Sequence, residues 1–377
     1  MDFKRILLPT LLLLLSCTGG EKNRQIEYRA IENEYATRFH IAIDTIDRVT
    51  ILELGSRLEG ESQLKKFRLT NTPISGNREE GEVTIEVPPK KIVAMSTTYL
   101  PFISLLGESD RVCAISGSKY VVDTTIRRGI KNGTIVDIGY ESSLNIELII
   151  SLDPDLILTY GIEGENNQYI AKLKSTGIAT MAVEEYMEQH PLGKLEYLKF
   201  FGALFGKESY ADSLYTQIRD SYLSQKSKVE GGLTPPVVLL NAPWRGVWYI
   251  PGGNSYMAHL IRDAGGEPLL SKKGSNYTQN LSVEEVLLKG EGVSYWLQPN
   301  QFETLEQLRK SDPLFENLTL IGAGRVYNNN KERGEGGGSA FWERGVVEPH
   351  IILKELIEIL HSNGKIKEEL VYYKPLK

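Results

Sequence analysis

Apolar residues follow two different patterns along the chain, and the change between them divides it into parts. Between residues 24 and 87, short runs rich in β-branched and aromatic residues alternate with clusters of Gly, Asn and Pro. Such runs between turn clusters are typical of strands. The pattern predicts a small antiparallel N-terminal sheet, with strands at residues 39–43, 49–54, 67–70 and 83–87.

Beyond Pro88-Pro89 the chain alternates between short, continuously apolar runs and segments of helical periodicity. Continuously apolar strands that alternate with helices are typical of a parallel or mixed α/β sheet covered on both faces. We expect strands at residues 92–95, 112–115, 156–160, 179–183, 237–240, 293–297 and 324–327. We expect helices at residues 99–106, 143–152, 169–175, 256–263, 283–289, 305–310 and 349–361.

A long helical stretch separates the two α/β regions. Residues 192–205 carry an apolar face and stop at Gly206, and residues 209–228 continue with apolar positions at helical spacing. The sequence therefore predicts an α/β protein of two lobes with mostly parallel sheets, joined by a single long helix, plus a small β-rich extension. The expected parts are a signal segment (1–17), a tether with the β-rich extension (18–87), an N-terminal lobe (88–190), a linking helical segment (191–232) and a C-terminal lobe with the final helix (233–377).

The N-terminus has the features of an export signal. Lys4 and Arg5 precede an apolar run at residues 6–15, which is shorter than the roughly 20 residues that a membrane-spanning helix needs. The run ends in Leu14-Leu15-Ser16-Cys17, which resembles the bacterial lipobox; an ordinary signal peptide with a chance cysteine is the alternative. We expect an exported protein that is anchored through a lipidated Cys17 to a bacterial cell-envelope membrane, on its periplasmic or outer face. No other segment of the sequence is apolar enough to predict a membrane span.

Charge and composition exclude several classes of protein. The chain has 377 residues and a formal net charge of −6, which argues against nucleic acid as a partner because phosphate binding needs a basic surface. Two cysteines exclude a disulfide-stapled fold, and the five histidines show no metal-ligand spacing. No Gly-x-Ser-x-Gly motif is present. The glycine-rich run at residues 334–339 lacks the Lys-Ser/Thr of a phosphate loop and is typical of a mobile loop. We therefore predict neither a catalytic site nor a metal site.

A local pattern occurs once in each predicted lobe. Asn145 and Ser282 are good helix N-caps, and Glu147 and Glu284 follow them at the second helical position. The spacing to the next predicted strand is the same in both lobes. An acidic first turn also compensates the helix dipole, so this pattern alone leaves a structural and a functional role for the two glutamates open.

A series of short motifs runs through residues 90–362 in a fixed order. They lie at residues 91–96, 105–107, 111–112, 137–139, 145–147, 152–158, 190–192, 264–266, 282–284, 342 and 349–350. Their order and spacing resemble the substrate-binding proteins of ABC importers for iron-siderophores, haem and cobalamin. Residues 24–87 lie outside this resemblance.

The resemblance implies a fold, a ligand and partners. It implies two rigid lobes with the ligand between them, and one Glu per lobe that pairs with arginines of the permease; Glu147 and Glu284 match those positions. The implied partners are an ABC permease dimer with its ATPase, a small-molecule metal chelate and a membrane, with no nucleic acid and no cofactor, and the protein is expected to be a monomer. The bound ligand would be an iron chelate (a siderophore or haem) or cobalamin.

Residues of the ligand cleft should lie in the loops at the carboxyl ends of the strands, where α/β proteins bind ligands. The loops offer seven candidates: Tyr99, Tyr160, Trp244, Arg245, Trp248, Trp342 and Arg344. Aromatic rings provide flat apolar contact, and arginine binds carboxylates or an anionic chelate. Arg245 and Arg344 beside the aromatic residues favour an iron compound, whereas cobalamin would favour aromatics with few charges. For Trp248 and Trp342 a purely structural role is the alternative.

Two other functions compete with ligand capture for transport. A surface lipoprotein with an adhesive or structural role would account for the β-rich extension, and failure to bind any chelate would favour it. An enzyme is the weaker alternative, because the sequence lacks the motifs that would carry its chemistry.

Overall fold

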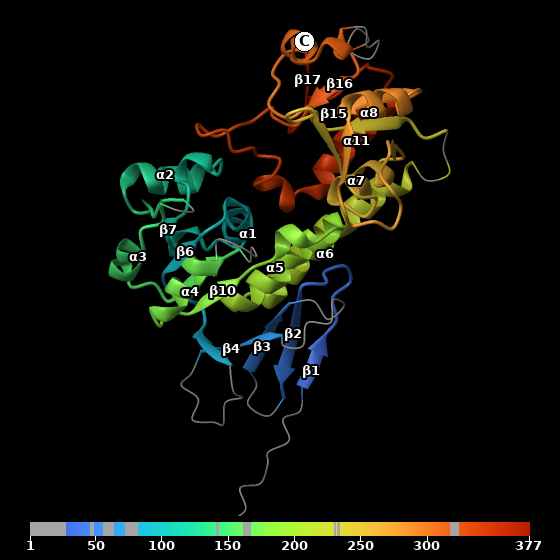
Figure 1. Cartoon of the computed structure of the whole chain (residues 1–377). Helices are drawn as coiled ribbons and strands as arrows, with labels where there is room; N and C mark the ends of the chain where they lie inside the picture. The colour runs from blue at the N-terminus through green and yellow to red at the C-terminus, as the bar shows by residue number, and fades with distance from the viewer. Residues whose placement is uncertain are drawn as a thin grey trace, which may run out of the picture.

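The fold is described from a computed structural model, which defines residues 28–45, 49–55, 64–71, 82–140, 143–160, 167–229, 231, 234–316 and 324–377. An N-terminal β-sheet, an N-terminal lobe and a C-terminal lobe surround a pair of long helices (Figure 1). The predicted signal segment and Cys17 lie outside the described residues. Among the described helices, none is both long and apolar enough to cross a membrane.

The predicted N-terminal sheet is present, and it has one more strand than expected. Its strands are β1 (Tyr28–Ile31), β2 (Phe39–Asp44), β3 (Val49–Leu54), β4 (Lys65–Thr70) and β5 (Val83–Glu86), in that spatial order. All neighbours are antiparallel except β4 and β5, which pair in parallel. The fully antiparallel prediction was therefore wrong for the last pair, because β5 runs in the same direction as β4, which two strands joined by a tight hairpin cannot do.

The N-terminal lobe contains a parallel sheet in the order β10-β9-β6-β7-β8. Its strands are β6 (Ile92–Ala94), β7 (Val112–Ile115), β8 (Val136–Asp137), β9 (Leu156–Thr159) and β10 (Thr180–Ala182). The helices are α1 (Leu100–Leu105), α2 (Thr124–Asn132), α3 (Ile146–Leu152) and α4 (Asn167–Ser175), with short 3-10 turns η1 (Thr97–Tyr99), η2 (Ser109–Arg111), η3 (Ser118–Tyr120) and η5 (Glu185–Met187). The sequence did not predict α2, because this helix is mostly polar, contains Gly129 and buries only Ile126.

The C-terminal lobe contains a five-stranded sheet in the order β13-β11-β15-β16-β17, parallel except for β17. Its strands are β11 (Val237–Leu240), β13 (Glu267–Pro268), β15 (Val293–Leu297), β16 (Val326–Asn328) and β17 (Lys374–Pro375). A separate antiparallel pair consists of β12 (Val247–Ile250) and β14 (Gln279–Ser282). The helices are α7 (Tyr256–Asp263), α8 (Val283–Lys289), α9 (Leu305–Ser311) and α11 (Pro349–His361), with 3-10 turns η6 (Pro313–Phe315) and η7 (Arg344–Val346).

The link between the lobes consists of two helices, where the sequence predicted a single long one. Helix α5 (Pro191–Phe205) ends at Gly206, whose φ of 65° is left-handed and suits glycine. Helix α6 (Glu208–Ser227) then packs against α5, so closely that a Cβ on Gly202 would lie 2.4 Å from the Cβ of Ala211. Helix α5 is buried along almost its whole length and contacts α1 of one lobe and α7 of the other.

A buried carboxylate joins the N-terminal sheet to this link. Glu196 of α5 is 0% exposed and accepts hydrogen bonds from the backbone N–H groups of Glu34 (2.9 Å), Tyr35 (2.8 Å) and Ala36 (2.8 Å). Its charge is balanced by Lys199, whose Nζ lies 2.9 Å from Oε1. The loop between β1 and β2 is therefore held by a single side chain of α5.

A second buried carboxylate extends this attachment. Glu188 accepts from the backbone N–H groups of Thr37 (2.7 Å) and Arg38 (2.8 Å). The ring of Phe39, which follows directly, packs edge-on against Tyr197 of α5. The apolar face of the sheet and the link form one continuous core, so the β-rich extension is attached to the link along its length.

Candidate functional site

A cavity of about 380 Å³ lies at the carboxyl ends of the N-terminal lobe's strands. Each of the five parallel strands is followed by a loop that contributes to its wall. The wall consists of Met95, Ser96, Thr97, Thr98, Ser116, Tyr120, Tyr140, Tyr160, Glu185 and Tyr186. The structure thus places Tyr160 on the wall of a cavity, together with three further tyrosines that the sequence analysis did not select.

A second cavity of about 420 Å³ lies between the two lobes. Thr97 and Tyr120 belong to both cavities, so the two adjoin. The rest of the second wall comes from the C-terminal lobe: Asn241, Gln298, Asn300, Asn329, Asn330, Arg333, Gly337, Gly338, Ser339 and Trp342. Asn241, Gln298 and Asn329 directly follow β11, β15 and β16, so these amides also lie at the carboxyl ends of parallel strands.

The amide side chains of this second wall are only partly satisfied by the protein. Asn300 donates to the carbonyl of Ala242 (2.7 Å), and Gln298 donates to the hydroxyl of Tyr373 (3.0 Å). In contrast, Asn329 Nδ2 and Asn330 Oδ1 are buried without a hydrogen-bond partner among the described residues. A buried polar atom without a partner costs about 1–3 kcal/mol, so a ligand that pairs with these atoms would recover that energy.

Glu185 is the buried acidic group of the first cavity. It is 1% exposed, and its Oε1 accepts a short hydrogen bond from the Thr98 hydroxyl. Its Oε2 has no hydrogen-bond partner among the described residues. Burial raises the pKa of this carboxyl above its ordinary value, although Lys194 and the Thr98 hydroxyl oppose the shift. Glu185 therefore offers a ligand a buried carboxyl oxygen, Oε2, that has no hydrogen-bond partner among the described residues.

Glu185 and the amides of Asn329 and Asn330 could have been found from the sequence. The run Asn328-Asn329-Asn330 and the pair Glu184-Glu185 directly follow predicted strands, and this position is the criterion that selected Tyr160. Aromatic and arginine side chains were the expected contacts for a chelate, so the carboxylate and amide groups of these loops were not among the predicted residues.

Two predicted ligand-binding residues belong to the hydrophobic core. Tyr99 is completely buried, and its hydroxyl donates to the carbonyls of Thr159 (2.9 Å) and Val183 (3.1 Å). Trp248 is also completely buried, and its indole N–H donates to the carbonyl of Leu240 (2.8 Å). Both predictions were wrong, because each side chain points into the packed layer behind the strands and has its polar atom satisfied there.

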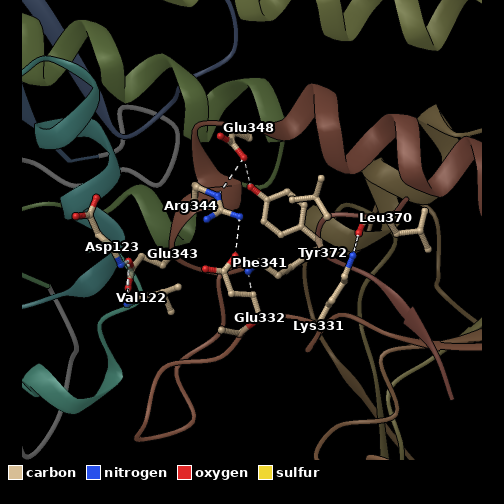
Figure 2. Close-up of polar contacts among 12 residues, drawn as sticks. Val122, Asp123, Lys331, Glu332, Phe341, Glu343, Arg344, Glu348, Leu370 and Tyr372 are labelled. Atoms are coloured by element: carbon tan, nitrogen blue, oxygen red, sulfur yellow. Dashed lines mark hydrogen bonds and ion pairs between the residues drawn. The ribbon is translucent and has the colours of Figure 1, made fainter. Parts of the chain in front are cut away.

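Arg344 is a third predicted ligand-binding residue, and its charge is already compensated inside the protein. Its guanidinium lies 2.9 Å from a carboxylate oxygen of Glu332 and 3.4 Å from one of Glu348 (Figure 2). The same guanidinium lies over the ring of Tyr372. Arg344 therefore stabilises the packing of its own lobe. It does not belong to the wall of either cavity, so its contact with a ligand stays a prediction.

The remaining candidates lie on the surface of the C-terminal lobe. Trp342 is 47% exposed, lines the second cavity and packs against Phe341 and Tyr256. Trp244 is 54% exposed, and the guanidinium of Arg245 lies 5.7 Å from the centre of its ring. Neither Trp244 nor Arg245 belongs to the wall of the two cavities, so their contact with a ligand stays a prediction.

Residues 92–332 match the model of the periplasmic binding protein family. The chain belongs to this family. It is 25% identical over 290 residues to an uncharacterized lipoprotein of Methanocaldococcus jannaschii, an alignment that covers 74% of this chain and 67% of the relative. It is 24% identical over 207 residues to a cobalamin-binding protein of Halobacterium salinarum, covering 55% of this chain and 53% of the relative. The chain thus spans about two thirds of the first relative and about half of the second.

Solved structures of the family share the fold. A periplasmic binding protein from Veillonella parvula superimposes with a TM-score of 0.59 at 13% sequence identity, covering 83% of this chain and 98% of that one. The predicted two-lobe α/β architecture is therefore confirmed. The sheet β1–β5 precedes the residues that the family model matches.

In this periplasmic binding protein, the repeated pattern of Asn145 and Ser282 forms real helix caps. Asn145 Oδ1 accepts from the backbone N–H of Leu148 (2.9 Å), and Ser282 Oγ accepts from that of Glu285 (3.1 Å). Glu147 and Glu284 are exposed in the first turns of α3 and α8, one in each lobe. Both carboxylates are thus accessible to a partner, and their docking role stays a prediction.

Proposed function

We propose that this periplasmic binding protein is the substrate-binding component of an ABC importer and captures one organic metal chelate between its lobes. The observation that carries the proposal is the pair of adjoining cavities built from strand ends of both parallel sheets. Ligands of α/β proteins bind at such strand ends, and each cavity has a volume in the usual range of about 300–1,000 Å³. The name of the Halobacterium salinarum relative supports a ligand of this kind.

The chemistry of the walls favours a corrinoid such as cobalamin. Hydroxyl-bearing residues dominate the first wall and amides are the commonest side chains of the second. A corrinoid presents many neutral amide groups that can pair with Asn329 and Asn330. Arg344, which favoured an anionic iron compound in the sequence analysis, is compensated by carboxylates. Arg333, the arginine of the second wall, lies 3.1 Å from a carboxylate oxygen of Glu303. Both arginines are therefore paired with carboxylates of the protein, and they attract an anionic ligand less strongly than unpaired arginines would.

An iron chelate or haem is the second candidate. Four phenol groups, those of Tyr120, Tyr140, Tyr160 and Tyr186, surround the first cavity. Tyrosine oxygen is an established axial ligand of haem iron, so this wall also suits a ferric centre.

A titration of the lipid-free protein with a panel of ligands tests the proposal. Cyanocobalamin, haem and ferric siderophores are added separately, and absorption spectra and native mass spectrometry report one-to-one complexes. We expect cyanocobalamin to bind. Binding of a ferric siderophore or haem alone would replace the corrinoid by the second candidate, and failure of every ligand would favour a surface lipoprotein with an adhesive or structural role.

The variant Asn329→Ala gives this titration a specific prediction. Nδ2 of Asn329 makes no hydrogen bond to the described part of the protein, so removal of this amide should change the melting temperature little. The loss of one hydrogen bond to the ligand, worth about 0.5–1.5 kcal/mol, should weaken binding about 2- to 10-fold. The exposed Asn132→Ala is the matched control. Unchanged affinity in Asn329→Ala would remove this amide from the site.

The two lobes are proposed to dock on a permease through Glu147 and Glu284. The double alanine variant should keep its fold and ligand affinity but lose binding to the reconstituted permease, because carboxylates suit arginine forks on a partner. A carboxylate that serves only the helix dipole would contribute about 0.3–1 kcal/mol of stability and nothing to docking. Glu208→Ala with Glu306→Ala is the control, since both are acidic residues in the first turn of a helix. Equal permease binding by both double variants would contradict the docking role.

We further infer export and lipid anchoring through Cys17, which lies outside the described residues. The Leu14-Leu15-Ser16-Cys17 motif supports this, as does the description of the Methanocaldococcus jannaschii relative as a lipoprotein. Cys17→Ser should shift the protein from the membrane fraction to the soluble fraction, or block its processing. A membrane-bound variant with an unchanged mature mass would contradict the inference.

A further inference from the structure

A segment of the C-terminal lobe reaches across to the N-terminal lobe. Residues 332–343, called the strap below, leave the lobe after β16 and extend towards α2 (Figure 1). The N–H of Gly336 donates to the carbonyl of Lys119 (2.8 Å). A Cβ on Gly338 would lie 1.9 Å from the carbonyl oxygen of Tyr120, so a residue with a side chain does not fit there. The glycine-rich run that the sequence presents as a mobile loop is therefore a close backbone contact between the lobes.

Glu343, at the end of the strap, forms a second contact between the lobes. It is 3% exposed, and its carboxyl points at the backbone just before α2 (Figure 2). Oε1 accepts from the N–H groups of Asp123 (2.6 Å) and Val122 (3.1 Å), and Oε2 accepts from that of Val122 (2.9 Å). One buried acidic side chain thus holds two backbone groups of the opposite lobe.

The position of the strap determines the shape of the candidate ligand site. Gly337, Gly338, Ser339 and Trp342 line the cavity between the lobes, and all four belong to the strap. Any change in how firmly Glu343 holds the N-terminal lobe therefore changes one wall of this cavity.

We propose that Glu343 is a positioning residue that fastens the strap across the two lobes, and that it does so most firmly when its carboxyl carries a proton. A neutral carboxyl with its proton on Oε2 keeps Oε1 as the acceptor for the N–H groups of both Val122 and Asp123, and gives up only the second contact from Val122 to Oε2. The ionised form must hold a charge in the buried contact, next to the carboxylate of Asp123. The inference concerns the ligand-free protein and does not depend on the identity of the ligand.

The electrostatics of the contact support this direction. Burial raises the pKa of Glu343 to about 7. Two charged groups face this carboxyl: Asp123 raises its pKa further, and Arg344 lowers it. The N–H groups of Val122 and Asp123, which donate to the carboxyl, also lower its pKa. An exposed carboxyl in an open strap has a pKa near its ordinary value of 4.5. The closed state therefore binds the proton more tightly than the open state, so protonation favours closure. The closed contact between Glu343 and the N-terminal lobe should be most stable below pH 4.5. Its stability should fall as the pH rises to about 7 and change little above that value.

Hydrogen exchange of the Val122 and Asp123 amides in the ligand-free protein tests the proposal. Each rate is divided by the intrinsic rate at the same pH, so that only opening of the contact is measured. In the wild type we expect the protection of both amides to fall at least tenfold between pH 5 and 7 and to level off above pH 7. Glu343→Gln, which resembles the neutral carboxyl, should keep high protection at every pH, and Glu343→Ala should show low protection at every pH.

Further variants distinguish the loss of the Glu343 contact between the lobes from a general loss of folding. Glu335→Ala removes an exposed ion pair between the strap and Arg127 and should leave the protection unchanged, because exposed pairs contribute little. Wild-type protection in Glu343→Ala would show that Glu343 does not fasten the strap. A wild-type pH profile in Glu343→Gln would assign the proton to another group and overturn the proposal even if Glu343→Ala fails to fold.

Discussion

Glu196→Ala is expected to weaken the attachment of the N-terminal sheet to the helical link and to lower the free energy of unfolding by about 3–5 kcal/mol, the range for breaking a buried charged interaction. The variant leaves the N–H groups of Glu34, Tyr35 and Ala36 without their acceptor. It also leaves Lys199 without the partner that lies 2.9 Å from its Nζ. Urea unfolding measures the loss, and limited proteolysis between β1 and β2 reports whether the sheet has separated.

The control for this prediction is Glu208→Ala, an exposed acidic residue in the first turn of α6. It should change stability by less than about 1 kcal/mol, because its carboxylate only compensates the helix dipole. If Glu196→Ala unfolds at the same urea concentration as the wild type, the sheet is held by the apolar contacts of Phe39 and its neighbours, and the carboxylate is dispensable.

Gly338→Ala should open the wall of the cavity between the lobes and weaken ligand binding at least tenfold. The new methyl group would lie 1.9 Å from the carbonyl oxygen of Tyr120 and 2.7 Å from its carbon, so the backbone of one lobe has to move. Both Gly338 and Tyr120 belong to the cavity wall, which means that the displacement occurs at the site itself. The loss of binding is measured as the affinity for the ligand identified in the panel. The opening of the contact between the lobes is measured as hydrogen exchange of the Val122 amide.

The effect of Gly338→Ala should be local, because Gly338 is only half-buried and lies before Ala340 and Phe341, the strap residues that belong to the hydrophobic core. We therefore expect a small change in melting temperature beside the large loss of affinity. Glu335→Ala, three residues earlier in the strap and exposed, provides the control. Wild-type affinity in Gly338→Ala would mean that the strap can move without affecting the ligand site.

The candidate site could be predicted in part. The rule that ligands bind at strand ends selected Tyr160 and Trp342, and both lie on cavity walls. The same rule selected Tyr99, which lies on the buried side of η1. Trp248 alternates with Tyr249 along β12, and the structure buries the first and exposes the second. Sequence position places a residue near a strand end, but the packing of the lobe decides which way its side chain points.

The sequence by itself determined the local structure of this protein. Apolar periodicity, the caps Asn145 and Ser282 and the stop at Gly206 act within a few residues, so most of the longer strands and helices of both lobes follow from short-range rules, with the polar helix α2 as an exception. Only the tertiary structure decided which carboxylates are structural. Glu196 and Glu343 each accept from backbone N–H groups more than 150 residues away along the chain. Backbone donors are the same in every residue, so no side-chain pattern marks such a partner, and the pairing exists only once the core has brought the two segments together.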